Sequence, residues 1–138
     1  LGLGIALSQP TLPTIVIDGD GAALMRLGSW ATNGYYGPKN MCHILLDNET
    51  HDSTGGQDTL SKGVQFAHCA QAMNYPQTHS VTSLESLSTL LHTWQKNPEL
   101  TFIHVKIHPG SPKKLGRPTQ TPATVATRLK TYIKQTIS

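Results

Sequence analysis

The chain has 138 residues, of which 37% are hydrophobic and 14% charged, with a formal net charge of +3. These values indicate one globular domain with a single core and exclude an intrinsically disordered chain. Basic residues are scattered, apart from Lys113, Lys114 and Arg117, so we expect no nucleic-acid surface. No apolar stretch reaches the roughly 18 residues of a membrane span, and the opening segment lacks the basic start of a secretion signal. We therefore expect a cytoplasmic protein.

Two cysteines, Cys42 and Cys69, lie far apart in the sequence and outside any CxxC motif. This pattern predicts two free thiols, buried or half-buried, in a reducing compartment. It argues against a disulfide or a metal-binding pair.

Four stretches along the chain predict strands. Residues 14–18 (TIVID) and 41–47 (MCHILLD) are apolar without alternation, which is typical of parallel strands covered on both faces. Residues 101–107 (TFIHVKI) are rich in β-branched and aromatic side chains, and residues 79–81 leave room for a short fourth strand. His43 and His104 lie within these runs and are expected to be satisfied core residues.

Helical patterns alternate with the strands. The opening residues, LGLGIALSQP, indicate part of an apolar helix, and another helix is expected from Ala22. Thr82 and Glu85 have the spacing of a capping box, and Pro122 opens a C-terminal helix. The alternation predicts an α/β fold of three layers, a mostly parallel sheet with helices on both faces. Residues at helical spacing mark three of the helices: Phe66, Ala70 and Met73; Leu84, Leu87, Leu91 and Trp94; Val125, Leu129 and Ile133.

The stretch VIDGDGAALM, residues 16–25, is unusual because acids and glycines separate two apolar runs. Its GDG lies where the first strand ends and a helix begins, and the free N–H groups of a helix start bind anions. Asp20 would repel a phosphate unless a Mg²⁺ lay between them. Asp47 and Asn48 end the next strand, beside the first, and so place a second oxygen ligand nearby.

Other interpretations of DGDG were compared with this one. An EF-hand loop would need a glutamate at position 29, which is Ser29. A dinucleotide fingerprint would need a third glycine at position 24, which is Leu24. A tight turn with solvated acids remains open on this stretch alone.

The spacing between GDG and a second motif is more specific evidence than the DGDG stretch alone. GDG at residues 19–21 is followed by 25 residues and then by Asp47-Asn48, which resembles the thiamin diphosphate motif of GDG and an Asn pair. Over about residues 3–131 the chain is similar to the diphosphate-binding half of the phosphonopyruvate and sulfopyruvate decarboxylase family. Four segments carry the resemblance: GDGAALMRLGSWAT, LLDNETHDSTGGQ, HVKIHPGS and LGRPTQTP.

The resemblance implies a thiamin-diphosphate-binding fold and a set of cofactor ligands. By similarity, Asp20, the side-chain oxygen of Asn48 and the main-chain carbonyl of Thr50 would hold Mg²⁺. Gly21 and Ala22 would offer N–H groups to the diphosphate, and Gly19 would permit the turn.

The loop HDSTGG, residues 51–56, would continue from these ligands into the active site. His51 would donate to the substrate or relay a proton, or else would pack on the cofactor site without a chemical role. Ser53, Thr54 and the N–H groups of Gly55 and Gly56 would receive a phosphonate or sulfonate, or would only shape the loop.

Two departures from the family pattern lie beside these ligands. Asp47 replaces the first Asn of the pair. Glu49 stands where the family commonly has glycine, and it adds a negative charge near the anion site unless its side chain turns outward.

The family resemblance also implies what the chain lacks. The glutamate that contacts the cofactor's aminopyrimidine belongs to a pyrimidine-binding domain, which we expect to be absent here. Residues 1–138 are therefore expected to be a single diphosphate-binding domain, truncated on its N-terminal side and inactive alone. A partner domain or subunit and a homo- or hetero-oligomer, a dimer or larger, are expected.

The implied activity is that of a carboxy-lyase, which converts phosphonopyruvate to phosphonoacetaldehyde and carbon dioxide. In this family the cofactor carries the carbanion chemistry and the protein places it. A sulfopyruvate decarboxylase subunit and a non-catalytic anion-binding domain are the alternatives. Arg117 and the proline-rich residues 108–121 receive no assigned role.

Overall fold

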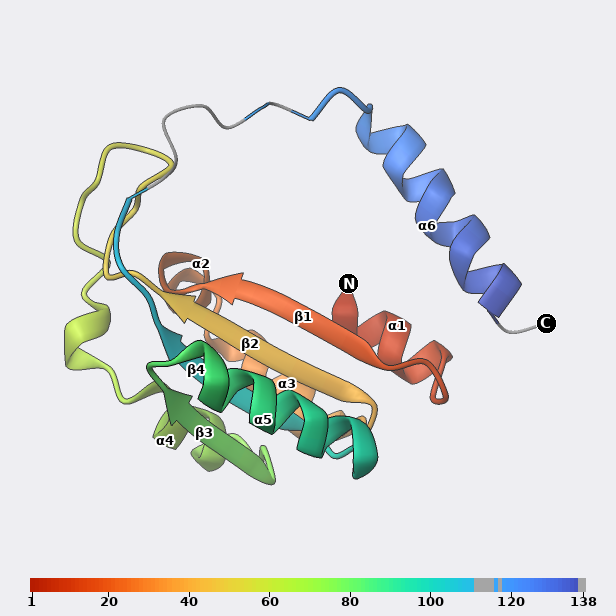
Figure 1. Cartoon of the computed structure of the whole chain (residues 1–138), viewed down its shortest axis with the longest axis horizontal. Coiled ribbons are helices and arrows are strands. Elements are labelled where there is room, and N and C mark those ends of the chain that lie inside the picture. The colour runs from red at the N-terminus through yellow and green to blue at the C-terminus, as the bar shows by residue number, and fades with distance from the viewer. Residues whose placement is uncertain (111–115, 117, 137–138) are drawn as a thin grey trace.

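The computed structural model describes residues 1–110, 116 and 118–136. Its centre is a four-stranded sheet in the order β1-β2-β4-β3, with every neighbouring pair parallel (Figure 1). The four predicted strands are confirmed, β2 with the expected bounds and the others within one or two residues at an end. The strands are β1 (Thr14–Gly19), β2 (Met41–Asp47), β3 (Gln77–Val81) and β4 (Thr101–Lys106).

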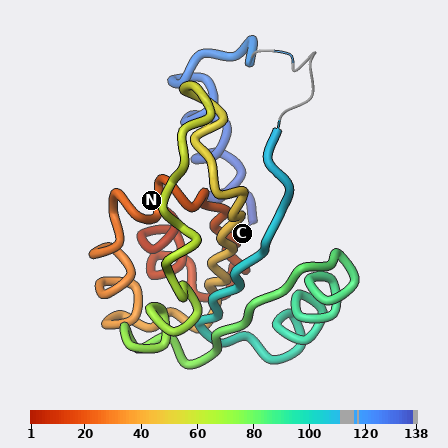
Figure 2. Tube along the Cα trace, turned by 90° about the vertical axis from the view of Figure 1, so that its left-hand side faces the viewer, coloured from red at the N-terminus to blue at the C-terminus, as the bar shows by residue number. Residues whose placement is uncertain are grey.

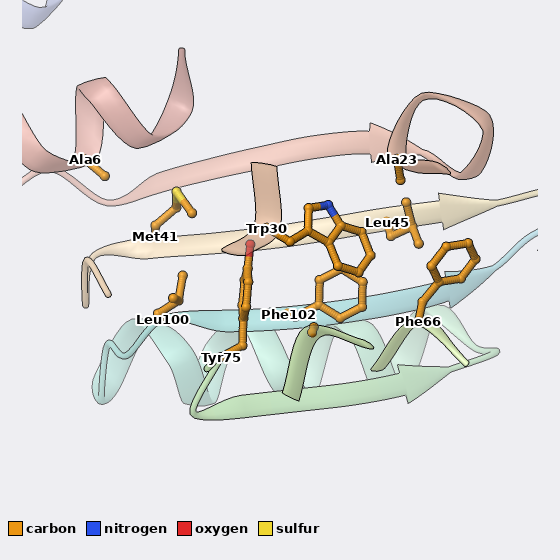
Figure 3. Close-up of a cluster of buried hydrophobic side chains, with 10 residues drawn as sticks. Ala6, Ala23, Trp30, Met41, Leu45, Phe66, Tyr75, Leu100 and Phe102 are labelled. Atoms are coloured by element: carbon orange, nitrogen blue, oxygen red, sulfur yellow. The ribbon is translucent and has the colours of Figure 1, made fainter. Parts of the chain in front are cut away.

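One face of the sheet carries an aromatic core that is covered by the first four helices. Trp30 lies at its centre, with its ring centroid 4.6 Å from that of Phe102 (Figure 3). Phe66 and Tyr75 complete the cluster, and each of the four side chains is at most 2% exposed. The helices are α1 (Gly2–Ser8), α2 (Asp20–Met25), α3 (Gly28–Tyr36) and α4 (Phe66–Ala72).

The opposite face is covered by α5 (Leu84–Lys96), whose Trp94 packs on Cys42, Ile44 and Ile103. Figure 1 shows α5 in front of the sheet, with α3 and α4 behind it. The predicted three-layer α/β architecture is therefore confirmed.

Cys42 is fully buried in this second layer, whereas Cys69 on α4 is half-buried. Burial raises the pKa of the Cys42 thiol to about 12. Both cysteines are free, as the sequence predicts.

Two helix boundaries differ from the expectation. α2 begins at Asp20 and not at Ala22, with Gly19 as its N-cap. The N-cap of α5 is Ser83, whose side chain accepts a hydrogen bond from the Ser86 N–H, so the capping box predicted for Thr82 is wrong by one residue. Ser83 has the extended backbone of an N-cap (φ −129°, ψ 149°), and this places its hydroxyl over the first turn.

The predicted C-terminal helix is α6 (Pro122–Thr136), but its apolar face is not packed against the sheet. No residue described in this helix is buried, and Val125 and Leu129 are 49% and 38% exposed. Periodicity therefore predicted the helix correctly without predicting burial. Among the described helices, none is both long and apolar enough to cross a membrane.

The segments that follow β2 and β4 both extend beyond the same edge of the sheet (Figures 1 and 2). This is the edge formed by the carboxyl ends of the parallel strands, where ligands of open α/β sheets bind. The short 3-10 helix η1 (Ser61–Gly63) lies between the loop after β2 and α4.

Candidate functional site

The carboxyl edge of β1 and β2 brings the predicted ligands together. Gly19 is in register with Leu46, so the residues that follow each strand are neighbours. A cavity of about 430 Å³ opens here, also bounded by Asp18, Asp52 and Ile107. The cavity is lined by every predicted site residue except Thr54, Gly55 and Gly56: Gly19, Asp20, Gly21, Ala22, Asn48, Thr50, His51 and Ser53.

Asp20 is the first residue of α2 and is only 3% exposed. Its carboxylate accepts a hydrogen bond from the Thr59 hydroxyl. Within the described residues it has no cationic partner, although a buried carboxylate is strongly destabilising unless a positive charge compensates it. A bound cation at Asp20 would supply that charge.

Asn48 and Thr50 form the next part of the cavity wall. The Asn48 amide oxygen accepts a hydrogen bond from the Thr50 N–H (3.3 Å), and its amide nitrogen donates to Asp52 Oδ2 (2.9 Å). Asp52 Oδ2 also accepts from the Gly110 N–H (2.8 Å), which ties this loop to the segment after β4. An amide oxygen has two lone pairs, so Asn48 keeps one for a ligand.

Gly21 is required by the close approach of His51. A Cβ at position 21 would lie 2.4 Å from His51 Cε1, so the ring packs directly on the start of α2. Gly19 differs, because its backbone is extended (φ −103°, ψ 153°) and a Cβ there would meet no atom within 4 Å. The turn does not need glycine at position 19, contrary to the sequence expectation.

The loop after His51 folds around its carbonyl oxygen. This oxygen accepts hydrogen bonds from the N–H groups of Thr54 (3.0 Å), Gly55 (3.2 Å) and Gly56 (3.0 Å). These groups are therefore used within the loop, which favours the shaping role over anion binding. Thr54 also donates its hydroxyl to His51 O (3.3 Å), whereas Ser53 remains at the cavity wall.

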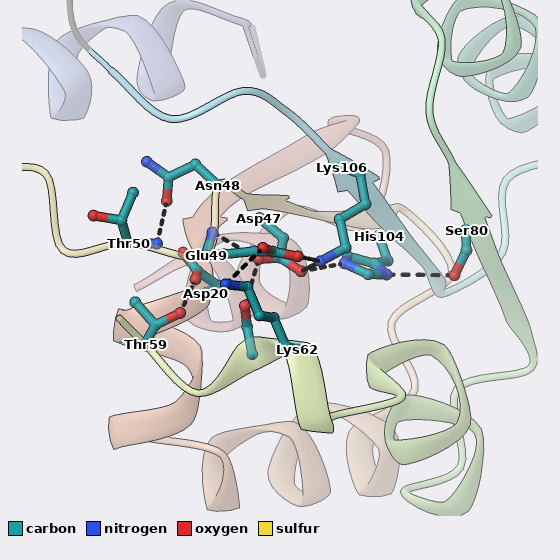
Figure 4. A network of polar contacts seen from close by, with 11 residues as sticks. Asp20, Asp47, Asn48, Glu49, Thr50, Thr59, Lys62, Ser80, His104 and Lys106 are labelled. Atoms are coloured by element: carbon teal, nitrogen blue, oxygen red, sulfur yellow. Dashed lines mark hydrogen bonds and ion pairs between the residues drawn. The ribbon is translucent and has the colours of Figure 1, made fainter. Parts of the chain in front are cut away.

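Asp47, directly before the predicted ligand Asn48, is fully buried. Its carboxylate accepts hydrogen bonds from Ser61 Oγ, His104 Nε2 and Lys106 Nζ, each at 2.8 Å (Figure 4). Burial alone would raise the pKa of Asp47, but these donors lower it to about 2, with Lys106 making the largest contribution. Asp47 is therefore ionised at neutral pH and anchors the base of the loop.

Glu49 turns away from the cavity wall toward two lysines. Its carboxylate lies 2.5 Å from Lys106 Nζ and 3.6 Å from Lys62 Nζ. The ion pair with Lys106 lowers the pKa of Glu49. We expected Glu49 to add a negative charge near the anion site unless its side chain turned outward, and in the structure it turns outward.

The two histidines predicted for the core are both buried. His104 is satisfied by Asp47, and its Nδ1 lies 3.4 Å from Ser80 Oγ. His43 Nδ1 lies 3.2 Å from the Tyr75 hydroxyl, but its Nε2 has no hydrogen-bond partner and lies 3.6 Å from Asp18 Oδ2. The prediction that both are satisfied is therefore wrong for this one atom. The nearby ring lowers the pKa of Asp18, which lines the cavity.

The donors at the cavity suit a hard cation. Asp20, Asn48 and the carbonyl of Thr50 provide a carboxylate, an amide and a main-chain oxygen, the types that Mg²⁺ prefers. This set contains one acid, and the described part of the chain has no group of three His, Cys, Asp or Glu residues that could hold a metal. The residues present therefore fit Mg²⁺ and a diphosphate, and they do not form a carboxylate-rich or thiolate site.

Three contributors to the site were missed from the sequence. Thr59 and Ser61 hold Asp20 and Asp47 from 39 and 14 residues away, and no local pattern marks such contacts. Lys106 follows an apolar run, as many surface lysines do. Arg117, considered for a role in the long loop, lies outside the described residues.

Comparisons with known proteins agree with this geometry. The chain is 49% identical over 133 residues to phosphonopyruvate decarboxylase of Streptomyces viridochromogenes, covering 96% of this chain and 33% of that protein. It is 47% identical to the enzyme of the same name from Streptomyces hygroscopicus, with the same coverage. Sulfopyruvate decarboxylase subunit beta of Methanothermobacter thermautotrophicus is 33% identical over 80% of this chain and 57% of that subunit.

The chain thus spans about a third of the length of the phosphonopyruvate decarboxylases that it matches. Residues 1–105 match the family described as thiamine pyrophosphate enzyme, C-terminal TPP binding domain. That match includes β1, β2 and every residue that lines the cavity except Ile107. The chain belongs to the C-terminal TPP-binding domains of thiamine pyrophosphate enzymes.

Proposed function

We propose that this chain holds the diphosphate end of thiamin diphosphate through Mg²⁺, as half of a decarboxylase that converts phosphonopyruvate to phosphonoacetaldehyde and carbon dioxide. The observation that carries the proposal is Asp20, a buried carboxylate without a cationic partner in the described chain, beside Asn48 and Thr50. The likeness to two phosphonopyruvate decarboxylases supports the substrate assignment.

The proposed division of labour follows from the donors. Asp20 Oδ1 or Oδ2, Asn48 Oδ1 and the Thr50 carbonyl bind Mg²⁺, while the N–H groups of Gly21 and Ala22 face the diphosphate. When bound, thiamin diphosphate supplies the carbanion chemistry that releases carbon dioxide from a 2-oxo acid. The chain's task is to bind and orient it.

His51 is proposed to face the substrate side of the site. Its ring packs on the start of α2, its carbonyl oxygen accepts the N–H groups of the loop 51–56, and the residue lines the cavity. An imidazole held in this way can donate a hydrogen bond to the substrate or relay a proton near neutral pH. Ser53, at the same wall, is proposed to contact the phosphonate.

The proposal requires a pyrimidine-binding half, as a second domain or a partner subunit. We call this chain together with that half the complete enzyme, and we propose that it is a cytoplasmic oligomer. This chain alone is proposed to be inactive, because none of its glutamates is placed at the cavity wall.

Calorimetric titration of thiamin diphosphate into the complete enzyme tests the assignment. Binding should require Mg²⁺, and EDTA should remove it. Asp20→Ala should raise the Kd by about 100-fold or more, because a metal ligand is lost. Glu85→Ala, which removes an exposed acid on α5, should leave the Kd unchanged. Mg²⁺-dependent binding that survives Asp20→Ala would refute the assignment of Asp20 as a metal ligand.

The substrate needs a separate test, because a sulfopyruvate decarboxylase subunit is also similar to this chain. Phosphonopyruvate and sulfopyruvate should be compared by kcat/KM on the same complete enzyme. We expect a preference for phosphonopyruvate of at least about tenfold. A preference for sulfopyruvate would replace the substrate assignment and leave the cofactor site intact.

A further inference from the structure

Lys106, the last residue of β4, connects two carboxylates that flank Asn48 in the sequence. Its Nζ lies 2.8 Å from Asp47 Oδ2 and 2.5 Å from Glu49 Oε1. Lys106 itself does not line the cavity that contains Asn48 and Thr50. Lys106 therefore contacts the loop residues that flank Asn48 and not the cavity itself.

The backbone on the C-terminal side of Asn48 is held in an unfavourable conformation. Glu49 has φ +63°, in the left-handed region where a non-glycine residue is strained. Two groups fix it there: its N–H donates to Asp47 Oδ1 (3.1 Å), and its carboxylate pairs with Lys106. The first restraint uses the Asp47 carboxylate, whose charge Lys106 balances, and the second uses Lys106 directly. Both restraints therefore depend on Lys106.

The turn at Glu49 decides where the predicted ligands point. Asn48 accepts the Thr50 N–H across this turn, so a change in the Glu49 backbone would move both the Asn48 oxygen and the Thr50 carbonyl. The same lysine also keeps two negative charges paired at the edge of a site for an anion.

We propose that Lys106 is a positioning residue, which holds Asp47 and Glu49 together so that Asn48 and Thr50 present their oxygens to the cavity. The proposal rests on the proposed function and assigns to it a residue outside the cavity. It predicts that the role of Lys106 depends on the two carboxylates and on its positive charge.

A mutant cycle in the complete enzyme tests this dependence. Lys106→Met should raise the Kd of thiamin diphosphate, measured by calorimetry at fixed Mg²⁺, by about tenfold or more. In an Asp47→Asn, Glu49→Gln background, where no carboxylate needs a partner, Lys106→Met should change the Kd by less than about threefold. Lys96→Met, an exposed lysine of α5, is the matched control and should change nothing.

Two further readouts separate positioning from general support of the fold. With Lys106→Met, the cofactor concentration for half-saturation should rise while kcat at saturating cofactor stays within about threefold. The melting temperature of the cofactor-free enzyme reports any loss of folding. If Lys106→Met does not fold, Lys106→Gln replaces it, because Gln keeps a donor for Asp47 without the charge; it should weaken binding to a similar extent.

The outcomes are distinct. An equal loss of binding in both backgrounds would show that Lys106 acts without the carboxylates and would overturn the inference, as would wild-type affinity in Lys106→Gln. Both results leave the proposed function in place. Absence of any Mg²⁺-dependent binding by the unmodified enzyme would instead overturn the proposed function, and this inference with it.

Discussion

A buried polar residue lies at each end of β2, Asn40 directly before the strand and Asp47 as its last residue, but the two are satisfied in different ways. At the amino end, Asn40 donates its amide N–H groups to the carbonyls of Ala6 (3.1 Å), Gln9 (2.8 Å) and Leu12 (2.8 Å). At the carboxyl end, Asp47 is ionised and surrounded by hydroxyl, imidazole and ammonium donors.

The difference separates support of the fold from support of the site. Asn40 closes the connection between α1 and the sheet, is uncharged, and lies at the edge away from the cavity. Asp47 is adjacent to Asn48 and holds the loop that lines the cavity. We therefore expect changes at Asn40 to affect stability alone, and changes at Asp47 to affect both stability and cofactor binding.

The largest effect is expected for Asp47→Ala. Removing the carboxylate leaves Lys106 and His104 without their buried partner and should destabilise β2 by about 4 kcal/mol. Cofactor binding should fall as well, because the base of the ligand loop is lost. Hydrogen exchange of the β2 amides and calorimetry on the complete enzyme measure the two effects. If Asp47→Ala were destabilised but bound the cofactor normally, Asp47 would support stability alone, as Asn40 is expected to do.

Asn40→Ala is the matched change at the other end. Three carbonyl oxygens lose their common donor, which should cost about 2 kcal/mol in the same hydrogen-exchange measurement. The Kd of thiamin diphosphate should stay within about twofold of the original value, since no cavity residue contacts Asn40. A tenfold weaker Kd would mean that the two ends of the strand are coupled.

Acid should destabilise the protein through Asp47, at the carboxyl end of β2, and not through Asn40, which does not titrate. Asp47 has a folded-state pKa of about 2, below the ordinary value of 3.8, so its ionisation favours the folded state. This stabilisation is complete above about pH 4 and is lost as the pH falls through 2, a change of about 2 kcal/mol. Asp47→Asn should lack that contribution, so its urea midpoint should fall less between pH 4 and pH 2. Equal slopes for the two proteins would contradict the assignment.

The smallest effects compare two serines. Ser61→Ala removes a donor to Asp47, and Ser83→Ala removes the N-cap of α5; each should cost about 1 kcal/mol. Only Ser61→Ala should weaken cofactor binding, by about threefold to tenfold, because only Ser61 contacts the anchor of the ligand loop. Calorimetry on both variants decides this, and equal affinities would exclude a role for Ser61 in the site.

Much of the fold was predictable because burial on both faces leaves a clear pattern. The apolar runs of β2 and β4 are unbroken where helices cover both sides of the sheet. The expectation of two covered faces is wrong for β1, an edge strand whose Ile15 and Ile17 are 47% and 66% exposed. The apolar spacing of the helices was a poorer guide to burial. Val125 and Leu129 keep helical spacing in α6 although neither is buried, and Leu84 at the start of α5 is 81% exposed.

The predictable part of the site consists of residues that belong to local sequence motifs. The position of Asp20 and Asn48 follows from two strand ends at one edge, and their neighbourhood was correctly anticipated. Their roles as ligands remain proposals. Thr59 and Lys106 contribute through contacts that depend on how the loop folds back and on the register of β4, and neither carries a sequence signal.

The raised pKa of Cys42 has a practical consequence. At neutral pH its buried thiol forms almost no thiolate, whereas Cys69, the chain's second cysteine, is half-buried on α4. An alkylating reagent therefore reaches Cys42 only when the layer between α5 and the sheet opens. The rate of Cys42 modification, followed by mass spectrometry, therefore reports the rate at which that layer opens. If thiamin diphosphate slows the modification, binding at the edge of the sheet stabilises the core layer around Cys42.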